Sequence, residues 1–586
     1  MIQLLVNAWK QIGLAVGVFA VFLGIYYYPD RTPFMQFEST ITYSWILGAF
    51  AVWIGLLVLL RKPLWQFWVK GFPTEKASLA GLVALLVFSS VYIVGHSEAR
   101  YRMLSDEHNH LQVAMSMHYF QRAERCDEGN YFDTDLQCHK FVTDIRPKAY
   151  PMMVYLGYSL FGFREWVPFA LNFMFFLLTA LLIFRLAHEL GCGYWGQLFS
   201  VMAWVFWPVN VWWVRTAGYE MSYVFFVALG CWLSWWMIQL QQPKERLAAA
   251  ALLGVTVAFA CQTRHEAYVM MPVILAPAVL FFLKQSTPAI VALMSWAIAV
   301  VPGIVVRAAF KDDFISDFNG APGAGFANLG TNLPGNLEFL FNVGGQWPSS
   351  FWVMALAVLG MFWIVVQFFR NSKQRASGVW VLAWFWCALL SISYFYWGKF
   401  QLFAHMRYSV PVYVPIALLV GYFAQQITEW RKQGWVKYAF VVFFAVWALR
   451  NAPWIEGSRL LNAILLTNED HHISEIIAKL PENAVFAYTR PAAFLVRKRS
   501  SYSYSPLLTP GGNWFDWAKL RSGGEVYYIR GLDCWRDKRV NFPEIDAWNM
   551  CEKIETDFEL QEFMSFPISG NYNLKVMKVL GPKKPS

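Results

Sequence analysis

Two adjacent carboxylates, Asp106 and Glu107, begin a polar segment at residues 106–110, about ten residues after an apolar stretch at 78–95. A carboxylate at the mouth of a helix bundle can act as a general base on a hydroxyl group that attacks an electrophile. The same pair can cap the helix that follows, because the helix macrodipole favours negative charge at its N-terminus. The residue types therefore fit either acid–base chemistry or helix capping.

Further ionisable residues lie in the turns between later apolar stretches, where we expect them at the same membrane face as Asp106. Each one alone fits a loop residue or a snorkelling side chain. Ionisable groups beside an apolar core are nevertheless costly and often mark a substrate path, so their shared face favours a functional site. They are Arg215, Glu220, Arg264, His265, His405 and Arg407.

Such a cluster suits a sugar that is linked to a lipid through phosphate. Arginine, lysine and histidine would hold the phosphate and neutralise it as it leaves. A carboxylate would accept the proton of the acceptor hydroxyl as its oxygen attacks the anomeric carbon. The apolar chain of the lipid would enter between helices.

The composition is typical of a polytopic membrane protein. Hydrophobic residues make up 57% of the chain, charged residues 15%, and the mean hydropathy is +0.37. A soluble chain carries about 25% charged residues. We predict roughly thirteen membrane spans, since a helix of about 20 apolar residues crosses the bilayer core. They lie around residues 11–28, 43–60, 78–95, 166–187, 196–213, 219–240, 247–262, 266–283, 289–306, 350–368, 378–397, 409–427 and 435–450.

Basic residues gather in alternate short loops, at 61–76, 244–246, 370–375 and 431–437. These loops all lie inside if the N-terminus is cytoplasmic, as the positive-inside tendency predicts, and an odd number of spans places the C-terminal part outside. The first span lacks a basic n-region and a cleavage site, which favours an uncleaved helix over a signal peptide. A basic inner surface facing anionic lipid explains most of the net charge of +10, so no nucleic-acid partner is expected.

Four of the eight cysteines support this orientation. Cys126 and Cys138 follow the third span, and Cys534 and Cys551 lie near the C-terminus, all on the expected outer side. Disulfides persist in such an oxidising compartment, so we predict disulfides here. The other four cysteines lie in or near spans without the spacing of a metal site.

Two long outer loops are expected, at residues 96–165 and 307–349. The first is predicted to contain a surface helix over 107–124 and a second short helix ending near Gly162. The second contains the flexible run 319–323, which fits a gate over a cavity or a plain connector equally. We predict a transmembrane domain at 1–451 and an outer α/β domain at 452–586. The latter has a helix at 473–480 and strands at 484–488, 525–529 and 572–579.

In this order of elements the chain resembles the lipid-phosphate-sugar-dependent glycosyltransferases of the GT-C fold. That family includes protein O-mannosyltransferases and the bacterial aminoarabinose transferase. The resemblance rests on Asp106-Glu107 after a span, a surface helix, the run 146–151 (Arg-Pro-Lys-Ala-Tyr-Pro) opening a second surface helix, and the turn 215–220. It is strongest over about 78–240.

The resemblance implies a GT-C-like helical fold and a role for each motif residue. Asp106 would be the base, Arg146 or Lys148 would bind phosphate, and Glu107 and Glu220 would orient the acceptor, the sugar or neighbouring cations. Two residues depart from the family pattern: Lys148 replaces a second proline, and Glu220 stands where aspartate is common. Two spans also precede the usual first one.

The function expected is transfer of a sugar from a polyprenyl-phosphate donor to an acceptor hydroxyl, by direct displacement at the periplasmic face of the inner membrane. The acceptor is a lipid, a glycan or a protein. A flippase for a lipid-linked sugar remains an alternative, although it should show paired broken helices or an internal repeat. An oligosaccharide ligase or polymerase is another.

Cofactor signals are weak. His108 and His110 with Asp106 could hold a divalent metal, but residues two apart on a helix face different directions, so no metal is implied. No Walker-type loop is present, and Trp212-Trp213 is followed by Val214 rather than by the aspartate typical of asparagine-linked oligosaccharyltransferases.

Overall fold

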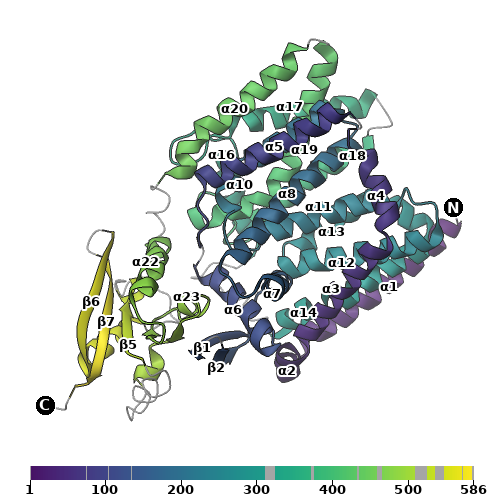
Figure 1. Cartoon of the computed structure of the whole chain (residues 1–586). Helices are drawn as coiled ribbons and strands as arrows, with labels where there is room; N and C mark the ends of the chain where they lie inside the picture. Colours follow the sequence, from purple (N-terminus) through teal and green to yellow (C-terminus); the bar gives the residue numbers. More distant parts are fainter. Residues whose placement is uncertain are drawn as a thin grey trace.

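The computed structural model of the chain describes residues 2–28, 30–73, 75–102, 104–132, 135–309, 324–370, 375–431, 434–457, 465–508, 524–534, 547–569 and 572–583. It is a polytopic membrane protein with a large helical body and a C-terminal sheet domain (Figure 1). The run 319–323, predicted to be flexible, lies outside the described residues.

Within the described ranges, nine helices are long and apolar enough to cross a membrane, or up to ten if the sharply bent pair α1 (Ile2–Tyr27) and α2 (Thr32–Thr40) counts as one span. Each of the nine matches a predicted span. They are α3 (Thr42–Leu59), α5 (Lys76–His96), α8 (Trp166–Glu189), α12 (Pro243–Thr263), α13 (Ala267–Lys284), α14 (Ser286–Ala309), α17 (Phe351–Arg370), α19 (Val410–Arg431) and α20 (Trp435–Glu456).

The remaining predicted spans are also helical, with one correction. Residues 219–240 form α11 (Glu220–Met237), and 378–397 form the shorter apolar helix α18 (Arg375–Ser393). The predicted single span at 196–213 is wrong, because the segment divides into α9 (Tyr194–Val205) and α10 (Pro208–Trp213). Pro208 lacks the N–H that would continue the first helix and starts the second one instead.

Burial separates central helices from peripheral ones. The apolar window that contains α19 is 83% buried and that of α12 is 78% buried, whereas α3 and α5 bury less than a third of theirs. A helix that is apolar all round and buried lies inside a bundle, while an apolar exposed one faces lipid. The central helices therefore form the rigid part of the body that carries the outer elements.

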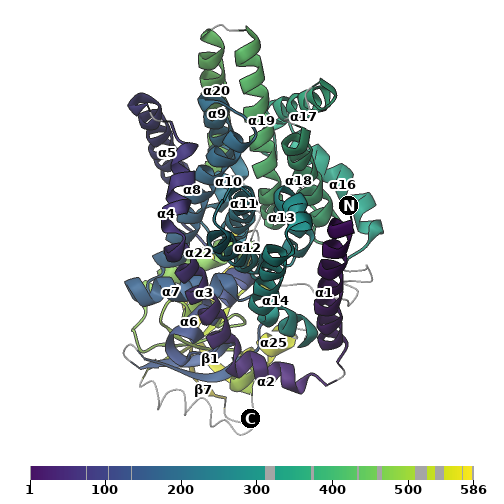
Figure 2. The ribbon, with the colours of Figure 1, turned by 90° about the vertical axis from the view of Figure 1, so that its right-hand side faces the viewer.

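The segment 96–165, predicted as the first outer loop, contains a helix at both predicted places, α6 (Leu104–Phe120) and α7 (Ala149–Phe161). Gly162 ends α7 with φ +75°, a left-handed conformation that favours glycine. The apolar side chains of α6 are almost fully buried, because the C-terminal domain and the strand β1 (Arg125–Phe132) pack against it. Figure 2 shows α6, α7 and β1 together at one end of the helical body.

The sheet has seven strands among the described residues, in the order β2-β1-β4-β3-β5-β7-β6. The predicted strands are present as β3 (Val485–Ala487), β5 (Val526–Arg530) and β7 (Tyr572–Pro582), and the predicted helix lies in α22 (Leu465–Lys479). The remaining C-terminal strands are β4 (Ser500–Tyr502) and β6 (Phe558–Ser569).

The sequence did not predict that the first outer loop contributes to this sheet. The hairpin of β1 and β2 (Asp135–Val142) joins it through one pairing, Gly129 with Ser501 of β4. This pairing places the outer loop and the C-terminal domain side by side, next to the start of α6.

Two disulfides support this region, as predicted. Cys126–Cys138 links the two strands of the hairpin, and Cys534–Cys551 ties the short helix η3 (Leu532–Cys534) to α25 (Ala547–Asp557). The second predicted outer loop contains a helix of its own, α16 (Phe326–Leu340). The smaller elements are α4 (Arg61–Lys70), η1 (Phe403–Ser409), α23 (Ala492–Leu495) and η2 (Ser505–Leu508).

Candidate active site

Asp106 lies in the first turn of α6, between two arginines from distant segments. Its Oδ1 accepts hydrogen bonds from Arg146 Nη2 at 2.7 Å and Nε at 3.2 Å, and its Oδ2 accepts one from Arg407 Nη2 at 2.6 Å. Arg146 precedes α7, and Arg407 lies in η1, just before the buried helix α19. One carboxylate thus joins the first outer loop to the centre of the bundle.

Glu220 completes the cluster from a third direction. It begins α11, is 2% exposed, and its Oε1 lies 3.4 Å from Arg407 Nε. Arg407 is therefore held between two carboxylates, those of Asp106 and Glu220. The sequence predicted these residues as site candidates, and the structure brings them together.

Arg264 approaches the same place from the end of α12. Its guanidinium is fixed by Glu266, which accepts hydrogen bonds from Nε at 3.1 Å and Nη2 at 2.5 Å. The guanidinium of Arg264 lies 4.6 Å from the ring centroid of Tyr408, and that of Arg407 lies 4.9 Å from the same centroid. The two cations therefore contact one aromatic ring.

Each of these two arginines keeps an unused donor at Nη1, and Arg407 Nε, 3.4 Å from Glu220, also makes no hydrogen bond to a described residue. The Nη1 atoms of Arg264 and Arg407 are buried, and neither has a hydrogen-bond partner in the part of the chain that the structure describes. Buried polar groups are almost always paired, so two orphaned guanidinium donors beside one ring need an acceptor. An anion such as a phosphate group supplies acceptor oxygens of the right charge.

The electrostatics keep the Asp106 carboxylate ionised. Burial raises its pKa, but the charges of Arg146 and Arg407 outweigh burial and hold the pKa well below its usual range. The pKa of Asp144 is lowered in the same way: burial opposes ionisation of its carboxyl group, but the charges of Arg146 and Lys148 lower its pKa to about 2. The site therefore contains fixed negative and positive charges at neutral pH.

Glu107 lies next to Asp106 but points to backbone rather than to the arginines. Its side chain is fully buried, and its carboxylate accepts hydrogen bonds from the backbone N–H of Arg102 at 2.6 Å and of Ala217 at 2.8 Å. These contacts tie α6 to the turn that precedes α11. Glu107 therefore holds Asp106 and Glu220 at a fixed separation.

Lys148 lies outside the Asp106 cluster, in a buried ion pair. Its Nζ is 2.9 Å from Glu38 Oε1 and donates to the backbone carbonyls of Asp144 at 2.5 Å and Arg146 at 2.8 Å. The two carbonyls accept two of the three ammonium donors, and the Glu38 carboxylate balances the charge. Of the two predicted phosphate ligands in this motif, Arg146 is the one placed at Asp106.

The other predicted residues have separate partners. Arg215 donates to the backbone carbonyls of Val94 and Ser97 and so closes the end of α5. The Nδ1 of His265 accepts from Arg307 Nε at 3.0 Å. His405 is half-buried beside Tyr408, with ring centroids 5.4 Å apart.

Sequence reasoning missed three residues that shape the site. Asp144 bonds the side chain of Arg146 and accepts from its backbone N–H at 2.7 Å, which a short Asp-x-Arg spacing can signal. Tyr408 supplies the shared ring, with no sequence signal beyond its place next to Arg407. Glu38 is signalled only as a lone acid between two apolar helices.

The two histidines that were weighed as metal ligands point apart. His108 Nε2 lies 3.6 Å from Asp470 of the C-terminal domain, whereas the ring of His110 packs against Tyr219 and Tyr150. Over the described residues, no group of three His, Cys, Asp or Glu side chains could hold a metal ion.

Comparison with known proteins places the fold. No family model matches the chain, and no curated protein matches its sequence. Two solved structures of ArnT from Cupriavidus metallidurans do match, each with a TM-score of 0.53 and 13% sequence identity, over 85% of this chain and 98% of theirs. The chain has a GT-C-like fold.

One of the two ArnT structures is in the apo state and the other is bound to undecaprenyl phosphate. At this identity the likeness shows the fold of the chain alone. The function of this GT-C-like protein is therefore argued from its own cluster of carboxylates and arginines.

Proposed function

We propose that the chain is a membrane glycosyltransferase that moves a sugar from a polyprenyl-phosphate donor to an acceptor hydroxyl. One observation carries the proposal: Asp106, Arg146, Arg407 and Glu220 converge from four distant segments in a GT-C-like fold. The two unpaired Nη1 atoms of Arg407 and Arg264 add the need for an anion. That an ArnT structure binds undecaprenyl phosphate supports the class of donor.

In this mechanism the donor phosphate takes the Nη1 donors of Arg264 and Arg407. The acceptor oxygen attacks the anomeric carbon, and the bond from that carbon to the phosphate oxygen breaks. The electron pair leaves with the polyprenyl phosphate, whose charge the arginines stabilise. The proton of the acceptor hydroxyl passes to the carboxylate of Asp106. Direct displacement inverts the anomeric centre.

Arg146 and Arg407 hold the pKa of Asp106 low, which makes its carboxylate a weak base while no donor is bound. A bound phosphate brings negative charge to the same arginines and weakens their hold on the carboxylate. Because a nearby negative charge disfavours ionisation, donor binding raises the pKa of Asp106 from its lowered value. The proposed base is thus strengthened when the donor is present.

The proposed location follows from charge and cysteines. The helix α6, which carries Asp106, lies at the same end of the molecule as β1 and α25, each of which carries a disulfide cysteine (Figure 2), and disulfides persist outside the reducing cytoplasm. We place the site, α6 and residues 452–586 at the periplasmic face of the inner membrane, with the N-terminus in the cytoplasm.

The test is sugar transfer in membranes from cells that express wild type or Asp106→Asn, supplied with radiolabelled polyprenyl-phosphate sugars. Label is followed into protein, lipid and glycan fractions. Wild type should transfer, and Asp106→Asn should lose at least a hundredfold in rate, the usual contribution of a positioned base. Asp135→Asn, an exposed carboxylate on β2, is the matched control and should transfer normally.

Equal transfer by wild type and Asp106→Asn, at equal protein level, would remove Asp106 from the mechanism. Absence of transfer by wild type with every donor would contradict the transferase. Transport of a lipid-linked sugar would then be measured in its place.

A further inference from the structure

A cavity of about 260 Å³ lies beside the Asp106 cluster, between α6, the β1–β2 hairpin and the C-terminal domain. Asn109 lines it, one helical turn after Asp106. Residues three apart on a helix are neighbours on its surface. The cavity wall therefore starts within one turn of the proposed base.

A chain of charges also connects the two places. Arg125 lines the cavity, and its Nη1 lies 3.9 Å from Asp144 Oδ2. Asp144 in turn bonds Arg146, which bonds Asp106. Three ion pairs thus link Arg125, in the cavity wall, to the carboxylate of Asp106.

The cavity carries polar groups that are buried and unpaired. His108 and Gln112 are each 1% exposed and line it, and neither His108 Nδ1 nor Gln112 Oε1 has a hydrogen-bond partner among the described residues. Thr489 Oγ1 is likewise buried and has no hydrogen-bond partner among the described residues. Buried neutral donors and acceptors of this kind suit a ligand with several hydroxyl groups.

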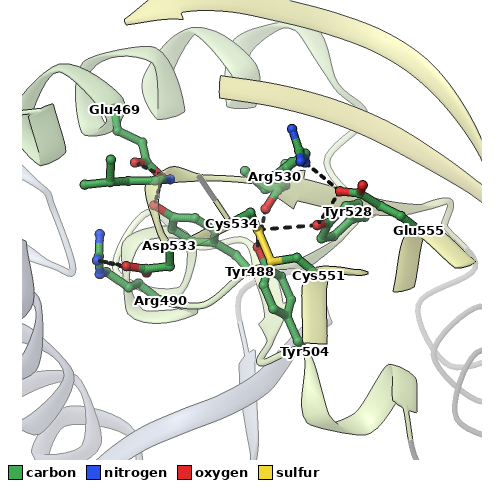
Figure 3. The surroundings of a disulfide bond; sticks show 12 residues. Glu469, Tyr488, Arg490, Tyr504, Tyr528, Arg530, Asp533, Cys534, Cys551 and Glu555 are labelled. Carbon is green, nitrogen blue, oxygen red and sulfur yellow. Dashed lines mark hydrogen bonds and ion pairs between the residues drawn. A yellow bond between two sulfur atoms is a disulfide. The ribbon is translucent and has the colours of Figure 1, made fainter. Parts of the chain in front are cut away.

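The guanidinium group of Arg490 has one nitrogen that can still bind an anion. Arg490 Nη2 bonds both carboxylate oxygens of Asp533, at 2.9 and 3.0 Å, while its Nη1 is buried without a partner in the described part of the chain. Figure 3 shows this pair next to the Cys534–Cys551 disulfide, which fixes the segment that carries Asp533.

The two carboxylates of the lining are already engaged. Asp127 pairs with Arg125 at 2.7 Å, and Glu128 accepts from Ser503 Oγ at 2.5 Å. Lys140, 54% exposed, lies 3.7 Å from Glu128 at the edge of the cavity. Each cation of the lining therefore has a carboxylate partner, and Arg490 Nη1 is a charged donor that remains for the anionic group of a ligand.

We propose that this cavity is the acceptor subsite and takes one anionic sugar unit, such as a uronic acid residue, of a glycan acceptor. The assignment rests on the proposed sugar transfer for its role. The volume is below the ~300–1,000 Å³ of sites for drug-sized ligands, which suits one sugar unit better than a lipid chain. The C-terminal domain then selects the acceptor, because it contributes Thr489, Arg490 and Ser503 to the wall.

Binding is tested on the full-length protein in detergent, without donor, by titration with D-galacturonate and with neutral D-galactose, followed by saturation-transfer NMR. Galacturonate should bind saturably and at least tenfold more tightly than galactose. Asn109→Phe should fill the cavity and abolish binding. Lys140→Met, at an exposed site, should weaken the binding of galacturonate severalfold and leave the binding of galactose unchanged.

Two controls separate this inference from the transferase proposal. Gln137→Phe adds the same bulk at an exposed position outside the cavity and should bind galacturonate like wild type. Asp106→Asn should also bind it, so loss of the proposed base and loss of the subsite give different results. The assignment is overturned if the Asn109→Phe variant still binds galacturonate, or if the wild-type protein does not bind it. Tighter binding of an acidic peptide than of galacturonate overturns the sugar class.

Discussion

Replacement of Lys148 tests whether this lysine is a phosphate ligand or a structural support. Lys148 and Glu38 are 1% and 0% exposed and form a buried ion pair. Removal of one partner from such a pair costs about 3–5 kcal/mol, because the other charge stays buried without compensation. We expect Lys148→Met to lose this much free energy of unfolding.

The double variant Lys148→Met/Glu38→Gln removes both charges. It should recover about 2 kcal/mol, because the carbonyls of Asp144 and Arg146 lack their donor in both variants, whereas only the single variant also leaves the charge of Glu38 buried without a partner. Its transfer rate should stay reduced, since Lys148 holds the backbone that presents Arg146 to Asp106.

Denaturant titration of the purified protein in detergent measures the free energy of unfolding, and a transfer assay gives KM for the lipid donor. Lys479→Met is the matched control, because this lysine is 53% exposed and an ion pair at the surface, such as its pair with Glu475, contributes little to stability. The reasoning is refuted if Lys148→Met is as stable as wild type and raises KM for the donor tenfold or more with kcat unchanged. Lys148 would then be a phosphate ligand.

Three further predictions concern the site, the response to pH and the outer domain. Arg407→Lys keeps the charge but loses the planar guanidinium that bonds Asp106 through Nη2 and lies 3.4 Å from Glu220 through Nε. Transfer should therefore fall at least tenfold at equal expression, and an unchanged rate would show that the guanidinium geometry of Arg407 is not needed. Burial lowers the pKa of His110 to about 3, so the unfolded state binds the proton more readily and stability falls as pH drops below about 6.5. Between pH 7 and 5 this costs about 2 kcal/mol, and His110→Gln should flatten that loss in thermal melts. Replacing Cys534 and Cys551 by serine removes a disulfide with a sequence separation of 17, which should lower the stability of the C-terminal domain by about 3 kcal/mol. The loss is measured as an earlier onset of proteolysis. Unchanged resistance to proteolysis would show that packing alone stabilises the domain.

Local pattern was sufficient for most helices and for several strands. Apolar stretches of membrane length predicted the nine candidate spans in the described ranges, because the bilayer imposes length and composition on each span separately. Alternation and β-branched residues likewise predicted β3, β5 and β7. Local pattern failed at 196–213, where apolar composition continues through Pro208 although the helix does not.

The sequence by itself determined the membrane class, through its composition, and predicted the two disulfides from the positions of the cysteines. That Asp106, Glu220 and Arg407 share one membrane face stays a prediction from the alternation of spans. Only the tertiary structure decided which of these groups meet. Arg407 binds Asp106 across 301 positions, and Glu38 rather than a ligand takes Lys148. Such pairings depend on how helices pack against each other, and local periodicity carries no information about partners that far apart in the chain.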